Sequence, residues 1–91
     1  MAKVLRKAEL NSSVTLLEVE AAKIAKKALP GQFIILRIDE EGERIPLTIA
    51  DYDREKGSIT IIFQKVGLTT MLLGDLNAGD EIKDFVVPDP Y

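Results

Sequence analysis

The chain has 91 residues, which suits one small domain with a single core and is too short to add a separate nucleotide-binding domain. Charged residues make up 30% of it, and the formal net charge of -3 argues against a nucleic-acid partner. Cysteine and histidine are absent, which excludes disulfides, iron–sulfur ligation by this chain and histidine-based metal sites or catalysis. Any chemistry would therefore come from a bound cofactor.

Neither a membrane anchor nor a metal site is expected. No apolar run approaches membrane-spanning length, and the N-terminus lacks the features of a cleaved signal, so a soluble cytoplasmic protein without a membrane partner is predicted. Acidic residues cluster in predicted turns, but their spacing matches no calcium loop. The same carboxylates give no support for acid–base catalysis, and no catalytic residue is assigned.

The first half of the chain predicts a hairpin, a short helix and a buried strand. Residues 4–10 and 14–20 are rich in Val, Leu and Thr and flank the polar turn Asn11-Ser12-Ser13. Residues 21–29 contain good helix formers before Pro30-Gly31, so they predict a short helix or a winding connection. Residues 32–38 are almost continuously apolar, which predicts a strand that is buried on much of both faces.

The segment "GERIPLTIAD", residues 42–51, predicts an extended strip that pairs imperfectly, because proline has no backbone donor and is tolerated mainly at strand edges. Residues 51–57 form a polar loop. Residues 58–66 alternate, with Ile59, Ile61 and Phe63 on one face, and are the clearest strand.

The last part of the chain predicts one helix and one strand. Leu68, Leu72 and Leu76 recur every four residues behind a threonine that can cap, which predicts a helix of about two turns with these leucines on its apolar face. Residues 80–87 predict a last strand that is closed by Pro88 and Pro90. Six short strands and a late helix indicate an all-β fold, a small antiparallel barrel in which closure removes exposed edges.

Arg44 opens the first of two candidate anion sites. Its planar guanidinium can give two parallel charge-assisted hydrogen bonds to a phosphate, and Thr48 adds a hydroxyl further along the same strip. The plainer alternative is an arginine on a solvated strand that pairs with Glu41 or Glu43.

Gly67-Leu-Thr-Thr, at the start of the predicted helix, is the second candidate. A glycine lets the backbone approach a ligand, and the unpaired amides of a helix start attract anions. Alternatively, Thr69 or Thr70 only caps the helix and Gly67 only makes the turn.

Four motifs in order carry a resemblance to a known family. They are Pro30-Gly31-Gln32-Phe33, Arg44-x-Pro46-Leu47-Thr48, Gly67-x-Thr69-Thr70-x-x-Leu73 and Leu76-x-x-Gly79-Asp80. Residues 4–84 resemble the FAD-binding barrel of the ferredoxin-NADP reductase superfamily. More closely, they resemble the N-terminal domain of the flavin subunit of NADH-dependent ferredoxin:NADP oxidoreductases, or sulfide dehydrogenases, and the electron-transfer subunit of dihydroorotate dehydrogenase.

The resemblance implies a six-stranded antiparallel Greek-key barrel, with one helix before the last strand and FAD along one rim. Arg44 would contact the FAD pyrophosphate, and the glycine-threonine turn would meet the diphosphate and adenosine side. The implied cofactor-binding residues are Arg44, Pro46, Leu47, Thr48, Phe63, Gln64, Val66, Gly67, Thr69 and Thr70. Many members have a tyrosine and a serine after the arginine, so aromatic stacking from the Pro46-Leu47-Thr48 strip is not expected.

Members of the family continue into a nucleotide-binding domain and a cysteine-rich tail that residues 1–91 do not contain. The resemblance therefore implies a FAD-binding module, a fragment or short form, that is not a complete enzyme by itself. It would pass electrons between pyridine nucleotide and an iron–sulfur partner once a NAD(P)-binding domain or subunit is supplied. Isolated, such a barrel offers about half of a cleft site and could lack FAD. The alternative is a barrel with a vestigial flavin site that acts as a protein-docking or assembly module.

Overall fold

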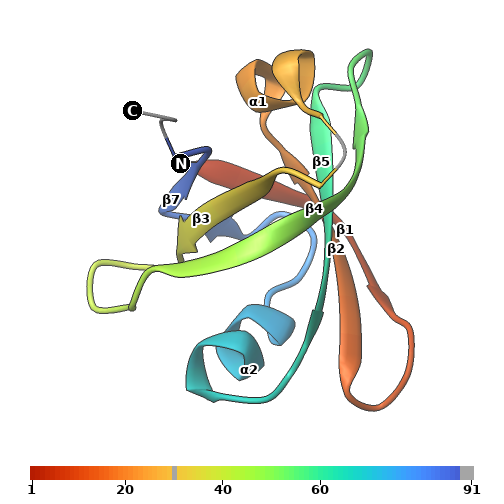
Figure 1. Cartoon of the computed structure of the whole chain (residues 1–91). Coiled ribbons are helices and arrows are strands. Elements are labelled where there is room, and N and C mark those ends of the chain that lie inside the picture. The colour runs from red at the N-terminus through yellow and green to blue at the C-terminus, as the bar shows by residue number, and fades with distance from the viewer. Residues whose placement is uncertain (30, 89–91) are drawn as a thin grey trace.

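The computed structural model describes residues 1–29 and 31–88 (Figure 1). The predicted helix stop at Pro30 and the closing Pro90 lie outside these residues. The elements are β1 (Ala2–Glu9), β2 (Val14–Glu20), α1 (Ala22–Lys27), β3 (Phe33–Arg37), β4 (Ile45–Asp53), β5 (Ser58–Gln64), α2 (Leu68–Gly74), β6 (Glu81–Ile82) and β7 (Asp84–Val86). The predicted hairpin and the short helix after it are both confirmed.

The strands form one antiparallel sheet in the order β6-β1-β2-β5-β4-β3-β7. After β2 the chain crosses over through α1, and the β3-β4-β5 meander returns β5 to the side of β2, which is a Greek key. α1 lies at one end of the sheet and α2 at the other (Figure 1). The predicted Greek-key barrel is therefore confirmed.

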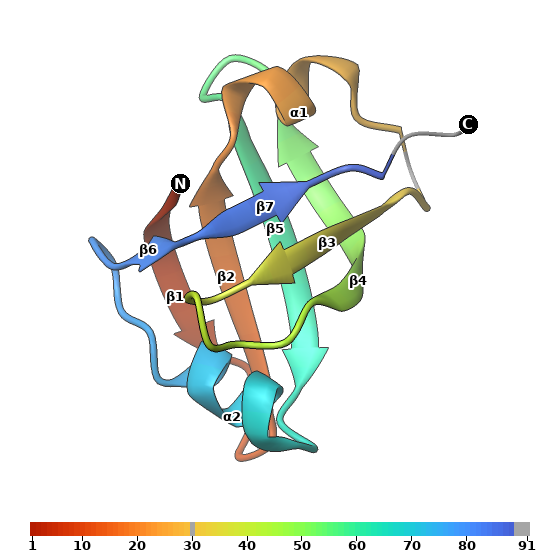
Figure 2. The ribbon, with the colours of Figure 1, turned by 90° about the vertical axis from the view of Figure 1, so that its left-hand side faces the viewer.

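The last predicted strand is divided in two, so the structure has seven strands where the sequence predicts six. β6 pairs with β1 and β7 pairs with β3, and only Lys83 separates them (Figure 2). The Lys83 amide donates to the Ile38 carbonyl oxygen at 3.0 Å, so the chain crosses from one edge of the sheet to the other without leaving it. A single segment thereby joins both edges and closes the barrel.

One face of each long strand points into the core. Ile59, Ile61 and Phe63 are buried as the alternation predicts. The prediction that residues 32–38 are buried on both faces is wrong, because a barrel has only one interior. Ile34 and Leu36 are buried, whereas the Phe33 side chain on the outer face is 46% exposed.

The apolar face predicted for α2 is wrong. Leu68 is 74% exposed and Leu72 is 47% exposed, while Thr69 and Leu73 are buried. Leu76 lies beyond the helix and packs only partly against the core. Thr69 and Leu73 have the same four-residue spacing as Leu68 and Leu72, so the two pairs define two neighbouring faces of this short helix. The leucine spacing alone therefore indicated the wrong face as the buried one.

Gly74 lies at a close contact between α2 and its neighbours. A Cβ atom on Gly74 would lie 2.7 Å from Cδ of Lys65 and 3.7 Å from Oγ1 of Thr15, so the helix packs against its neighbours at this glycine. The face that carries Thr69 and Leu73 turns into the core.

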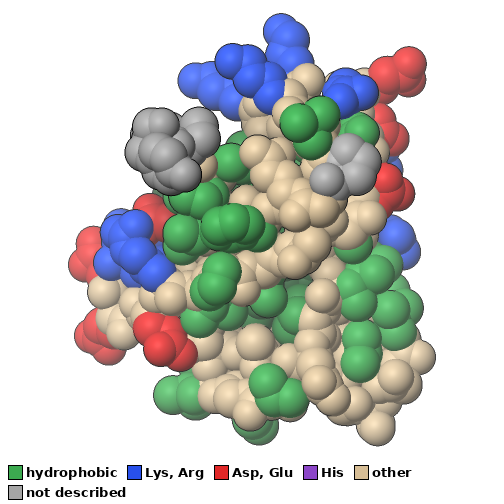
Figure 3. Space-filling view, in the orientation of Figure 1, with side chains coloured by type: hydrophobic (Ala, Val, Ile, Leu, Met, Phe, Trp, Pro, Cys, Tyr) green, Lys and Arg blue, Asp and Glu red, His purple; other side chains and the backbone are tan. Residues whose placement is uncertain are grey.

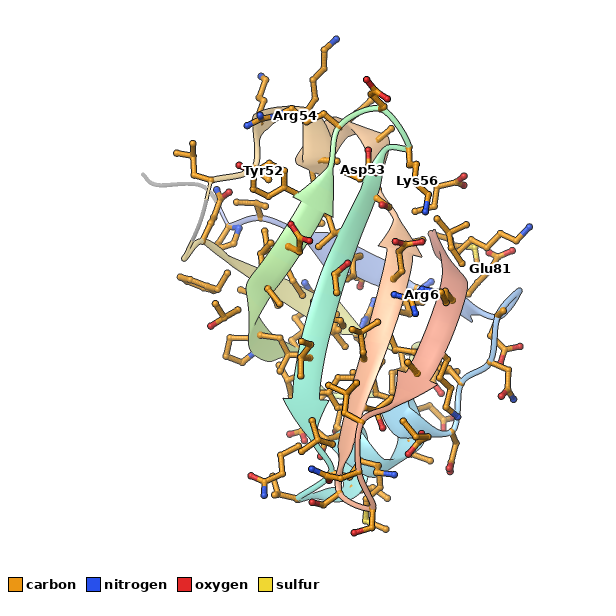
Figure 4. All side chains as sticks on the ribbon, turned by 90° about the vertical axis from the view of Figure 1, so that its right-hand side faces the viewer. Arg6, Tyr52, Asp53, Arg54, Lys56 and Glu81 are labelled. Carbon is orange, nitrogen blue, oxygen red and sulfur yellow. The ribbon has the colours of Figure 1, made fainter. Side chains whose placement is uncertain are left out.

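The β4–β5 hairpin extends further than the sequence predicts. β4 continues to Asp53, and Tyr52 pairs with Ile59 in a region expected to be loop. At the end of the hairpin the Arg54 guanidinium lies 4.7 Å from the centre of the Tyr52 ring, and its Nη2 donates to the Ala28 carbonyl oxygen at 3.0 Å (Figure 4). The hairpin is thereby fixed to the end of α1.

Gly57→Ala is expected to lower the free energy of unfolding by about 1–3 kcal/mol. Gly57 has a φ of +69°, and a Cβ atom there would lie 3.0 Å from the Ala22 Cβ. Gly67 provides the control, since its φ of −153° is extended backbone and its Cβ position meets no described atom within 4 Å. Gly67→Ala should change stability by less than about 1 kcal/mol. Urea denaturation of both variants measures the difference, and equal losses would contradict it.

Candidate functional site

β4 changes partners along its length. Residues 45–48 pair with β3, whereas Ile49 and the residues after it pair with β5, with a register shift between Ile49 and Asp51. Pro46 lies opposite Ile35, in a half-strand that has no β5 partner. The predicted imperfect pairing of this strip is therefore confirmed, and the sheet opens between the first half of β4 and the end of β5.

Arg44 immediately precedes this open half-strand. Its side chain is 60% exposed, and its Nη2 lies 3.7 Å from Oδ2 of Asp84, which is an ion pair without a hydrogen bond. Arg37 Nε donates to the same carboxylate oxygen at 2.8 Å. The alternative pairing with Glu41 or Glu43 is not what the structure shows. A guanidinium placed in this way keeps its forked donors available to an external anion.

One hydrogen bond brings the two candidate anion sites together. Thr69 Oγ1 donates to Glu43 Oε1 at 2.7 Å, across 26 positions of the chain. Glu43 is next to Arg44, and Thr69 is in the first turn of α2. The glycine-threonine turn therefore lies beside the Arg44 strip, where the first half of β4 has separated from the end of β5.

Thr70 caps α2 from within the helix. Its Oγ1 accepts from the amides of Val66 and Gly67, each at 3.0 Å, and donates to the Gly67 carbonyl oxygen at 3.1 Å. The capping alternative therefore holds for Thr70 and not for Thr69. Gly67 is the N-cap residue of α2, and neither its extended backbone nor the described atoms around it exclude a Cβ.

The remaining predicted site residues differ in how far their side chains are exposed to solvent. Pro46 and Thr48 are exposed on β4, and Leu47 is half-buried. Gln64 and Val66 are exposed at the open end of β5, whereas Phe63 is in the core and could meet a ligand only through its backbone.

A shallow depression of about 380 Å³ lies on the outer face of β3 and β4. Its lining residues are Gly31, Phe33, Pro46, Leu47 and Thr48. Phe33 is the residue that sequence reasoning missed, although an alternating assignment of residues 32–38 would have placed it outward. A second hollow, of about 910 Å³, lies between α1, β7 and the start of β1 and contains none of the predicted site residues.

Two negative findings concern the described residues alone. Within residues 1–29 and 31–88, no group of three or more acidic side chains is arranged to hold a metal ion. In that same part of the chain, no helix is long and apolar enough to cross a membrane.

No family model matches the sequence. A solved structure, described as that of the NADH-dependent reduced ferredoxin-NADP oxidoreductase and used for insights into flavin-based electron bifurcation, aligns with a TM-score of 0.93 at 36% identity. The alignment covers 97% of this chain and 32% of that one. The chain belongs to the ferredoxin-NADP reductase superfamily, as a barrel domain of the FAD-binding type. The resemblance carried by the four sequence motifs is thus confirmed.

Two curated relatives align with almost the whole barrel domain. The domain is 54% identical over 88 residues to an uncharacterized protein from the adh 3' region of Clostridium beijerinckii, covering 97% of the domain and 30% of that protein. It is 38% identical over 85 residues to a Thermotoga maritima homolog of the electron-transfer subunit of dihydroorotate dehydrogenase B (NAD(+)), covering 93% of the domain and 30% of the relative. The chain therefore spans about a third of the length of the proteins it matches.

Proposed function

We propose that this barrel is the FAD-binding module of a subunit of a NAD(P)H-dependent flavin oxidoreductase, which passes electrons between pyridine nucleotide and an iron–sulfur partner. Membership of the superfamily and the names of the relatives support this proposal. A bound flavin would supply the redox chemistry, and the barrel would supply binding and orientation.

Arg44 and the turn at Gly67 would hold the diphosphate. The exposed guanidinium offers forked donors to phosphate oxygens, and Gly67 leaves room for close approach to the backbone of the turn. Thr69 and Thr70 keep that turn in place through their hydrogen bonds to Glu43 and to the turn itself.

The remaining predicted residues would line the rest of the cofactor. Pro46, Leu47 and Thr48 would lie beside the isoalloxazine and ribityl chain. Phe63, Gln64 and Val66, at the end of β5, would lie along the nucleotide, with Phe63 contributing backbone only.

The observation that best supports the proposal is the hydrogen bond between Thr69 and Glu43. It joins two segments singled out separately for anion binding, and it does so where β4 has left β5. The Arg44 strip and the start of α2 are thereby held together at the opening between the first half of β4 and the end of β5.

The complete oxidoreductase needs more than this barrel. The relatives are about three times as long as the matched region, since that region is 30–32% of their length. We infer that a NAD(P)-binding domain and an iron–sulfur centre are supplied by that further length or by partner subunits.

Titration of the isotopically labelled 91-residue chain with FAD, followed by amide chemical shifts, tests the proposal. Shifts are expected in residues 43–48 and 64–70, with none in the turn at residues 54–57, which lies beside α1 at the opposite end of the sheet from α2 (Figure 1). The titration is repeated with a separately produced nucleotide domain of a full-length relative. Shifts caused by that domain but never by FAD would favour the docking module instead.

A further inference from the structure

The outer face of β3 carries apolar side chains toward solvent. Phe33 and Val86 are each 46% exposed, and Ile35 is half-buried. Ile35 lies opposite Pro46 of β4 on one side and opposite Val86 of β7 on the other. Figure 3 shows hydrophobic side chains gathered over this part of the molecule. We call Phe33, Ile35 and Pro46 the apolar strip, and Val86 lies beside it.

The apolar strip has a charged end and an aromatic end. Arg44 lies just before β4, next to the row formed by Ile35 and Pro46, together with Arg37 and Asp84. Phe33 pairs with Thr48 at the other end and lines the shallow depression there. This arrangement is complementary to a molecule with an anionic group at one end and a flat apolar ring system at the other.

The superfamily resemblance predicts no aromatic contact with the flavin ring from the Pro46-Leu47-Thr48 strip. The four residues that follow Arg44, residues 45–48, are aliphatic or hydroxylated, so this first half of β4 offers no aromatic ring. The structure brings an exposed aromatic ring to the same depression from the neighbouring strand. Aromatic contacts stabilise flat ring systems by stacking or by edge-on packing, and the desolvated area is large.

We propose that Phe33 contacts the isoalloxazine ring of the flavin and supplies the aromatic surface that the first half of β4 lacks. This inference rests on the proposed function, because it needs a flavin at the Arg44 strip. It assigns to a residue on β3 an aromatic contact that the three implied flavin contacts on β4, Pro46, Leu47 and Thr48, cannot provide.

The experiment compares two ligands, FAD and ADP, on the 91-residue chain and its variants by calorimetry or chemical-shift titration. ADP retains the diphosphate and adenine but has no isoalloxazine. Phe33→Ala should weaken FAD binding roughly tenfold and leave ADP binding within about twofold. Phe33→Tyr keeps the ring and should retain FAD affinity within about threefold.

Val86→Ala is the matched control, because Val86 is as exposed as Phe33, lies beside the apolar strip and does not line the depression. It should change FAD affinity by less than about twofold. Thermal melting of each variant confirms folding, which is expected because Phe33 is outside the core.

Three results would overturn the inference while leaving the proposed function in place. They are equal losses of FAD and ADP affinity in Phe33→Ala, no loss of FAD affinity in that variant, and a loss in Val86→Ala as large as in Phe33→Ala. A wild-type chain that binds neither ligand would overturn the proposed function, and the role of Phe33 with it.

Discussion

Leu73→Ala should lower the free energy of unfolding by about 2–5 kcal/mol, the range for emptying a fully buried leucine site. Leu73 is 0% exposed and belongs to the single core, so its removal leaves a cavity beneath α2. Leu72→Ala, one position earlier, should cost less than about 1 kcal/mol because that side chain is half in solvent. Urea denaturation of both variants against the wild type measures the two losses.

Both variants replace a leucine of α2 by alanine. The change in helix propensity is therefore the same in both and cancels when their stabilities are compared. A larger loss for Leu72→Ala would restore the face that the leucine repeat predicts. Similar losses would mean that α2 does not hold one fixed rotation against the barrel.

Arg44→Ala should weaken FAD binding about 10- to 100-fold, which is the loss of a charge-assisted hydrogen bond to a phosphate. The same substitution should change the free energy of unfolding by less than about 1 kcal/mol, since Arg44 is exposed and its contact with Asp84 is a long surface ion pair. Calorimetric titration with FAD and urea denaturation measure the two effects separately.

Arg6→Ala is the control for charge. Arg6 is exposed on β1, on the face shown in Figure 4, and its removal lowers the net charge of the chain by the same amount. At physiological salt, a charge further from the ligand than the screening length should alter FAD affinity by less than about twofold. Equal losses of affinity in both variants, or losses of stability that match the loss of affinity in Arg44→Ala, would remove the phosphate role from Arg44.

The fold could be predicted closely where a local pattern had one solution. Alternation in residues 58–64 defined a strand with one buried face, and Asn11 marked the first turn, where its Oδ1 accepts from Ser13 and Val14. The pattern was insufficient where two solutions were equally good. The leucines of α2 fit either of two faces, and the break at Lys83 depends on a hydrogen bond from its amide to the Ile38 carbonyl oxygen that no local sequence encodes.

Local sequence patterns predicted the site only as two separate segments, and it was the family resemblance that implied one site for both. Arg44 and Gly67 each stood in a local sequence pattern that is typical of an anion site. That the two segments lie side by side is seen only in the hydrogen bond from Thr69 to Glu43, which joins distant parts of the chain. Phe33 was missed for a related reason. A continuous apolar run indicates burial, and only closure of the barrel shows which of its side chains stay outside.

The segment that closes the barrel also carries the carboxylate that faces both arginines. Asp84 is the first residue of β7, and it reaches Arg37 and Arg44 only while β7 is paired with β3. On a ribosome, β1 to β5 are complete in the emerging chain before this carboxylate has been synthesised. The ion pair between Arg44 and Asp84 thus depends on β7, and a molecule whose β7 has come loose loses this contact even though β1 to β5 still pair with one another.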